Sequence, residues 1–89
     1  MPAVHLLIKG KVQGVFYRAS AKEFADKLNI KGWIKNTNES HVEAMANGDD
    51  AAIKKFIEWC KEGPRHAIVS EVIVEKSGET AFQDFVILR

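Results

Sequence analysis

Two glycines and one arginine stand close together in the segment Gly10–Arg18, which reads GKVQGVFYR. Glycine permits positive φ and close approach of a ligand, and free backbone N–H groups beside a helix N-terminus bind anions. Arg18 adds a planar fork of charged donors that suits two oxygens of a phosphate. The segment lacks the Walker A and dinucleotide-binding patterns. It predicts a loop that binds the phosphate of a small substrate, although its spacing alone fits equally well a glycine-rich turn with a surface arginine.

The elements around this loop follow from hydrophobic periodicity. Val4–Ile8 alternates as a strand does, and apolar residues at helical spacing come after the loop. Ser20 and Glu23 have the spacing of a capping box, which would start the helix at Ala21. A phosphate site would instead favour a helix N-terminus nearer Arg18. The apolar residues of the loop are expected to anchor it in apolar surroundings: Val12, Val15 and Phe16.

The rest of the chain is read in the same way. The bounds of the later helices and strands follow from turn residues, from β-branched runs and from a second amphipathic stripe. The first helix should end at Asn29 and Gly32, and strands should cover Trp33–Asn36 and His41–Asn47. Gly48, Asp49 and Asp50 should mark the start of a second helix, which Gly63-Pro64 should stop. A strand at Ile68–Val74, a turn at Lys76–Thr80 and a last strand at Phe82–Leu88 should follow.

This order, β-α-β-β-α-β-β, predicts an α+β fold. Two helices separated by a hairpin are typical of the ferredoxin-like split βαβ sandwich, in which an antiparallel sheet carries both helices on one face. The short C-terminal strand should extend that sheet or pair at its end. We expect residues 1–89 to form a single domain, because 89 residues suffice for one modest core.

Composition narrows the class of function. Charged residues make up 28% of the chain, and 13 basic against 12 acidic residues leave a net charge of +1. A nucleic-acid or membrane surface would need a basic excess on one face, so we expect neither partner. One cysteine, no apolar run of membrane length and no signal-peptide pattern favour a cytoplasmic protein. Nothing indicates an oligomer, and a monomer is expected.

No other residues form a persuasive catalytic or metal-binding group. His5, His41 and His66 lack the spacing of metal ligands and are expected to be structural or exposed. Cys60 lies on the apolar stripe of the second helix and is expected in the core. We therefore predict a site without metal or cofactor.

The loop resembles the first signature of the acylphosphatase family: glycine, any residue, Val-Gln-Gly-Val, two further residues and then arginine. A second signature appears as Gly32-Trp33-Ile34-Lys35-Asn36, with Val42 and Gly48 at the expected distances. The resemblance covers nearly the whole chain and implies a small free-standing acylphosphatase with a ferredoxin-like fold. Two departures stand out: Tyr17 where phenylalanine or methionine is usual, and Ser40 where a turn glycine is usual. Either Ser40 adopts positive φ at a steric cost, or Asn38 takes that conformation instead.

The resemblance implies hydrolysis of acyl phosphates to a carboxylate and inorganic phosphate. In such an enzyme Arg18 would bind the phosphate and Asn36 would position the attacking water. Backbone N–H groups would complete the cradle, at Gln13, Gly14, Val15, Phe16, Tyr17 and Arg18. The chemistry needs little else, because the leaving carboxylate has a conjugate acid with a pKa of about 4 and departs without a general acid.

Two other functions are open on the sequence. A domain of this fold could hold an anion or carbamoyl phosphate without turning it over. RNA-recognition domains share the split βαβ plan, but they carry an aromatic signature on a central strand. His41–Asn47 has no aromatic side chain of that kind. The presence of both Arg18 and Asn36 favours the enzyme.

Overall fold

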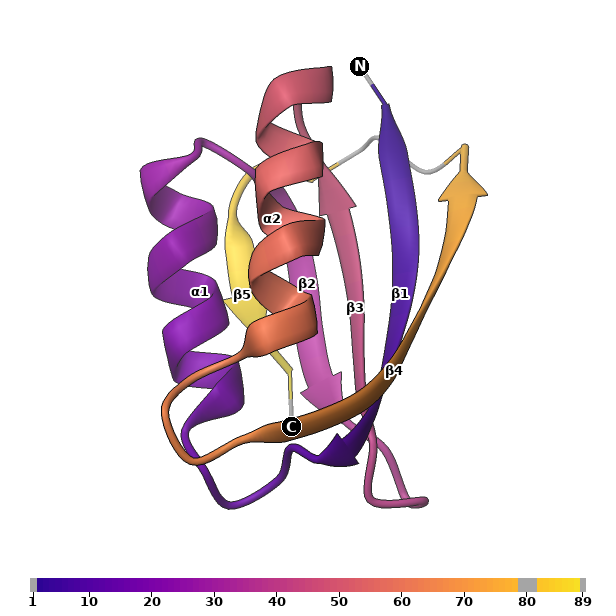
Figure 1. The fold of residues 1–89 in the computed structure, drawn as a ribbon. Helices are drawn as coiled ribbons and strands as arrows, with labels where there is room; N and C mark the ends of the chain where they lie inside the picture. Colours follow the sequence, from indigo (N-terminus) through magenta and orange to yellow (C-terminus); the bar gives the residue numbers. More distant parts are fainter. Residues whose placement is uncertain (1, 79–81, 89) are drawn as a thin grey trace.

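The computed structural model describes residues 2–78 and 82–88, and their fold is a five-stranded sheet with both helices on one face (Figure 1). The strands lie in the order β4-β1-β3-β2-β5. Neighbours run antiparallel except β2 and β5, which are parallel. The ferredoxin-like prediction is confirmed. The elements are β1 (Ala3–Lys11), α1 (Tyr17–Lys27), β2 (Lys31–Asn36), β3 (Val42–Asn47), α2 (Asp50–Glu62), β4 (Ile68–Ser77) and β5 (Phe85–Ile87).

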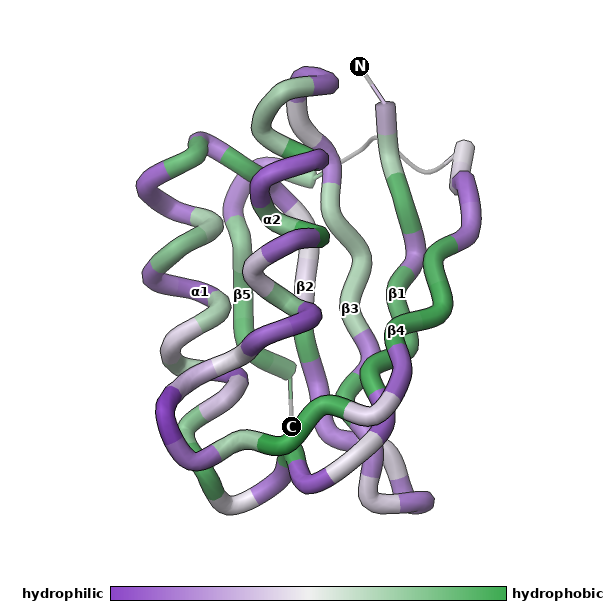
Figure 2. Tube along the Cα trace, in the orientation of Figure 1, coloured by the Kyte–Doolittle hydropathy of each residue, from purple (hydrophilic) through white to green (hydrophobic). Residues whose placement is uncertain are grey.

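The core lies between the sheet and the two helices. Alternate residues of the central strands are fully buried there, and Figure 2 shows that hydrophobic residues make up much of β1. On β3 these are Val42, Ala44 and Ala46, the face that the sequence predicts. Phe56 and Cys60 of α2 belong to the same buried cluster as these residues. The predicted burial of Cys60 is confirmed.

The first helix begins four residues earlier than the capping box predicts. Phe16 occupies the N-cap position, and the Ser20 N–H already donates to the Phe16 carbonyl at 3.0 Å. Ser20 is therefore inside the helix, and the predicted start at Ala21 is wrong. Tyr17, the first helical residue, is buried, and its hydroxyl donates to the Cys60 carbonyl of α2, a long-range contact that the local capping pattern of Ser20 and Glu23 does not reflect.

Other boundaries also differ from the prediction. Gly10 does not open the loop: β1 continues through it, opposite Val69, after a shift of register at Lys9. A Cβ at Gly10 would overlap the Ile68 carbonyl oxygen, so glycine allows close approach of β4 there. Gly32 lies inside β2 and does not end α1, whereas Asn29 does adopt the left-handed conformation expected of a helix end.

The second half of the chain follows the prediction closely at α2. Asp49 caps this helix by accepting the Ala52 N–H at 2.8 Å, and Gly63 ends it with φ 71°. By contrast, β4 continues through Lys76, which the sequence placed in a turn, and β5 is shorter than predicted. The predicted turn residues at 79 and 80 lie outside the described residues.

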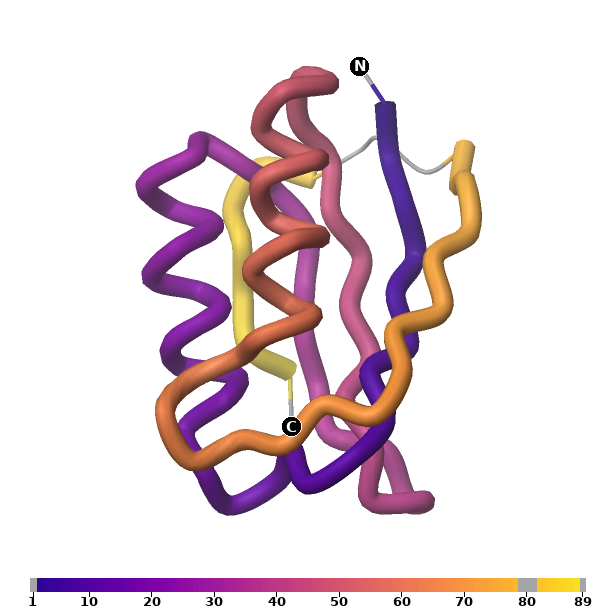
Figure 3. The backbone as a smooth tube through the Cα atoms, viewed as in Figure 1, coloured from indigo at the N-terminus to yellow at the C-terminus, as the bar shows by residue number. Residues whose placement is uncertain are grey.

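One end of the sheet gathers three segments that are distant in the sequence. The β1–α1 loop and the β2–β3 hairpin both lie at this end, and the chain after α2 passes close by (Figure 3). Within the described residues, neither helix has the length and apolar content that crossing a membrane would require.

Candidate active site

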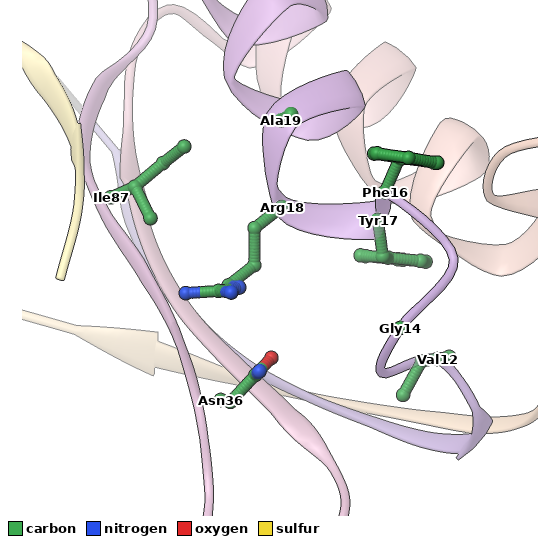
Figure 4. Close-up of a pocket in the computed structure, with 8 residues that line it drawn as sticks. All are labelled: Val12, Gly14, Phe16, Tyr17, Arg18, Ala19, Asn36 and Ile87. Atoms are coloured by element: carbon green, nitrogen blue, oxygen red, sulfur yellow. The ribbon is translucent and has the colours of Figure 1, made fainter. Parts of the chain in front are cut away.

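A pocket of about 330 Å³ lies at the end of the sheet where β1 leads into α1. It draws on four elements: the β1–α1 loop, the first turn of α1, the end of β2 and β5 (Figure 4). Its lining residues are Val12, Gly14, Phe16, Tyr17, Arg18, Ala19, Asn36 and Ile87.

Arg18 and Asn36 face each other across this pocket. Arg18 extends from the first turn of α1 toward β2, and Asn36, the last residue of β2, points toward its guanidinium (Figure 4). Arg18 is half-buried and Asn36 is exposed. The two side chains singled out by the sequence are thus brought together, although 17 residues separate them in the chain.

The loop reaches this arrangement through positive φ angles at two residues, Gly14 and Phe16. Gly14 has φ 74°, and open space surrounds the position of a Cβ there, so glycine is required by the backbone angle and not by crowding. Phe16 has φ 63° and ψ 25°, a left-handed conformation that is uncommon for an aromatic residue. These angles turn the chain directly from the loop into α1.

The N-terminus of α1 has no capping side chain, and its first turn contains no acidic residue. The first N–H groups of a helix lack acceptors within the helix, and together they carry a partial positive charge. Tyr17, Arg18 and Ala19 occupy this first turn and line the pocket. The contrast with α2, which Asp49 caps, shows that α1 leaves its N-terminal donors available to an anion.

Only some of the predicted phosphate-binding residues line the pocket. Four of them line the pocket: Gly14, Phe16, Tyr17 and Arg18. Gln13 and Val15 are not among the lining residues. The carboxamide of Gln13 instead donates to the carbonyls of Thr37 at 3.0 Å and His41 at 2.8 Å. It thereby joins the loop to the hairpin that follows Asn36.

The anchoring of the loop also differs from the prediction in one respect. Val12 is buried and Val15 is half-buried against the core, as expected. Phe16 is 82% exposed, so the prediction that it anchors the loop is wrong. Tyr17 is the anchor in its place, because its ring is buried against Trp59 and its hydroxyl donates to the Cys60 carbonyl at 2.6 Å.

Burial keeps the hydroxyl of Tyr17 protonated. Burial, reinforced by the adjacent Cys60 thiol, raises the pKa of Tyr17 far above its ordinary value. Burial likewise raises the pKa of Cys60 to about 12, against a smaller opposing effect of the hydrogen bond with Tyr17. Although Tyr17 lines the pocket, its hydroxyl is therefore neutral and already engaged in the core.

The turn after Asn36 settles the question raised by Ser40. Ser40 itself adopts positive φ, 70°, and Asn38 is not among the residues with positive φ. The Thr37 hydroxyl accepts the N–H groups of Glu39 at 3.2 Å and His41 at 3.1 Å. These bonds hold the hairpin in a shape that a glycine would adopt with less strain.

Sequence reasoning missed Val12, Ala19 and Ile87 as lining residues. Ala19 could not be assigned to the pocket, because the predicted helix start at Ala21 placed it outside the helix. Ile87 was unrecognisable because it joins the site only through the parallel pairing of β5 with β2, opposite Ile34. Of the pocket's lining residues, only Asn36 and Ile87 lie outside the segment from Val12 to Ala19.

The remaining titratable side chains lie elsewhere. His5 is bonded to Glu43 at 2.6 Å, and Lys9 lies 3.9 Å from Glu71 across β1 and β4. In the part of the chain that the structure describes, no three His, Cys, Asp or Glu side chains come together to hold a metal ion. The lining residues themselves include no side chain of these four types.

Comparison with known proteins relates the whole chain to one group of enzymes. The family model described as Acylphosphatase matches residues 4–87. An acylphosphatase from Pyrobaculum islandicum is 51% identical over 94% of this chain and 90% of its own length. One from Marinobacter nauticus is 45% identical over 91% and 89%, respectively. The crystal structure of acylphosphatase from Bacillus subtilis superposes with a TM-score of 0.96 at 31% identity, over 100% of both chains.

Proposed function

The chain belongs to the acylphosphatase family, and from that membership we propose that Arg18 and Asn36 carry the hydrolysis of a small acyl phosphate in the pocket. The reaction cleaves a carboxyl–phosphate anhydride to give a carboxylate and inorganic phosphate. The observation that supports these roles is the placement of both side chains on one pocket beside the uncapped N-terminus of α1. The relatives matched over about nine-tenths of their own length are enzymes, which favours catalysis over a non-catalytic binding module.

The phosphoryl group lies against Arg18 and the N–H groups of the loop and first turn. A guanidinium donates two parallel hydrogen bonds and keeps its charge at any working pH. The open donors of α1 add the partial charge of a helix N-terminus. Both are in place before the substrate arrives, because Val12 and Tyr17 fix the two ends of the loop in the core. Charge that develops on the phosphoryl oxygens therefore meets a preorganised environment.

Asn36 orients the attacking water. Its carboxamide oxygen accepts a hydrogen bond from water, and a carboxamide has no basic group that could remove the proton. Its position across from Arg18 lets the water approach the phosphorus on the side away from the loop (Figure 4). Positioning of this kind is the main requirement of phosphoryl transfer.

The proton of the attacking water passes to the phosphate itself. None of the pocket's lining residues is a histidine or a carboxylic acid, and the Tyr17 hydroxyl is engaged in the core. The P–O bond to the acyl group breaks, and the carboxylate leaves with the electron pair. Its conjugate acid has a pKa of about 4, so no group has to protonate it. An alkyl monoester would expel an alkoxide and should resist this site.

We also propose that the enzyme works as a cytoplasmic monomer without metal, nucleic acid or membrane. The donor set of the pocket supports the metal-free part of this proposal, because Arg18 supplies the positive charge that a cation would otherwise bring. The single buried Cys60 is consistent with a reducing compartment.

The test is an assay of the purified protein on acetyl and benzoyl phosphate with EDTA present. We expect hydrolysis of both and none of glycerol phosphate. Arg18→Ala should lower kcat/KM by about 100-fold or more, and Arg18→Lys should restore only part, because lysine lacks the planar fork. Lys54→Ala, which removes an exposed charge from α2, is the matched control and should keep full activity. Wild-type protein that is inactive on both acyl phosphates would contradict the proposal, and activity lost only with EDTA would contradict its metal-free part.

A further inference from the structure

Phe16 is the most exposed large apolar side chain among the described residues, and it lines the pocket. Isolated exposed apolar residues are ordinary on protein surfaces. Ile68 is 65% exposed and Val86 43%, and neither lines this pocket. What distinguishes Phe16 is therefore its location on the pocket, two residues before the arginine that holds the phosphate.

The backbone at Phe16 gives no reason for a phenylalanine. A left-handed φ of 63° at an N-cap favours glycine or asparagine, and it costs an aromatic residue free energy. Its side chain contributes nothing to the cap and is not part of the core cluster. The left-handed backbone at Phe16 thus carries a cost that neither the helix cap nor the core cluster offsets, which directs attention to a contact with the substrate.

The apolar side chains of the pocket lie on either side of its polar centre, which Arg18 and Asn36 form. Phe16 and Ile87 flank Arg18 on opposite sides in Figure 4, while Val12 is buried beneath the loop. A phosphoryl group held at Arg18 and the first turn of α1 leaves its acyl substituent to project past this centre, toward the opening. The side chains available there are the exposed ring of Phe16 and the half-buried Ile87.

We infer that Phe16, with Ile87 opposite, is the acyl-side specificity determinant, and that the site favours acyl phosphates whose acyl group is apolar and ring-sized over acetyl phosphate. The inference rests on the proposed function, because it presumes that the phosphate lies at Arg18. An apolar acyl group buries part of the Phe16 ring on binding, and an aromatic one adds a ring–ring contact. An acetyl group is too small to reach both walls. A charged acyl group would find no partner of opposite sign beyond Arg18 itself.

The experiment measures kcat/KM for benzoyl and acetyl phosphate and takes their ratio. The ratio isolates the acyl side, because both substrates present the same phosphate to Arg18. In Phe16→Ala we expect the benzoyl-to-acetyl ratio to fall about 5- to 10-fold, and in Ile87→Ala by a smaller factor. Ile68→Ala truncates another exposed apolar side chain away from the pocket and should leave the ratio as in the wild type.

A second variant separates the ring from the backbone. Phe16→Asn adopts the left-handed conformation readily and removes the apolar surface, so it should lower the ratio as much as Phe16→Ala does. A benzoyl-to-acetyl ratio that stays at the wild-type value in both variants would overturn the inference, including the case in which kcat/KM falls equally for both substrates. Either result leaves the proposed function standing as long as wild-type protein hydrolyses acyl phosphates. Inactive wild-type protein would instead refute the proposed function.

Discussion

Gln13 donates a hydrogen bond from its carboxamide to the backbone carbonyl of Thr37 at 3.0 Å, and a second one to His41. Thr37 directly follows Asn36 in the chain, so Gln13 couples the loop that leads into α1 and Arg18 to the strand end that bears Asn36. The two halves of the site belong to different elements, and this pair of bonds is a direct polar link between them. We regard Gln13 as a positioning residue.

The first prediction concerns this link. Gln13→Met keeps the length of the side chain and removes both donors, leaving two carbonyls without their partner. Unfolding free energy should fall by about 1–3 kcal/mol, and kcat should fall by roughly 10-fold with a smaller change in KM, because alignment of water and phosphate is lost. Urea denaturation and steady-state kinetics give the two readouts. A variant that loses stability but keeps the wild-type kcat would show that Gln13 has only a structural role.

Asn36 provides the second prediction. Asn36→Ala should lower kcat by about 100-fold with little change in KM, since the water is oriented only on the way to the transition state. Asn36→Asp places a negative charge next to the bound phosphate and should raise KM as well. Asn38→Ala, in the same hairpin and exposed, is the control. Near-normal kcat in Asn36→Ala would remove the proposed role in orienting water.

Ser40 gives a prediction about stability. Because Ser40 has φ 70°, Ser40→Gly relieves strain of about 1–2 kcal/mol and loses up to about 1 kcal/mol through the greater freedom of the unfolded chain. The net effect should be stabilisation of up to about 2 kcal/mol, seen as a rise in Tm of several degrees. Asn38→Gly, in the same turn without positive φ, should not stabilise. Thermal unfolding of both variants checks this, and a lower Tm for Ser40→Gly would mean that its backbone strain is absent in solution.

The pair of Tyr17 and Cys60 predicts alkaline sensitivity. Both groups have a pKa raised in the folded protein, that of Cys60 from 9.0 to about 12. The unfolded chain therefore releases these protons at lower pH than the folded one. Their contribution to stability is complete below pH 9 and is lost as the pH rises from about 9 toward 12. Urea denaturation at pH 7 to 11 should show this decline, and Tyr17→Phe should show a shallower one. A flat profile above pH 9 would contradict the burial of both groups.

The sequence allowed the fold and the two central side chains to be predicted, because alternation and signature spacing are local signals. It misplaced the start of α1, since the capping pattern of Ser20 and Glu23 is local whereas the buried hydroxyl bond of Tyr17 depends on α2. It also misjudged Phe16, because hydrophobicity alone does not say whether a side chain faces the core or the solvent. Ile87 could not be assigned at all, because its place depends on the parallel pairing of β5.

The acceptors of Gln13 have a consequence for how this site can change over evolutionary time. Both are main-chain carbonyls, which every amino acid possesses, so replacement of Thr37 or His41 does not by itself delete the link. The proposed phosphate cradle has the same property, since its N–H groups also belong to the main chain. If the proposed roles hold, we expect mutational vulnerability to be concentrated in the side chains of Arg18, Asn36 and Gln13. The hairpin would then be free to diverge wherever its backbone angles are kept.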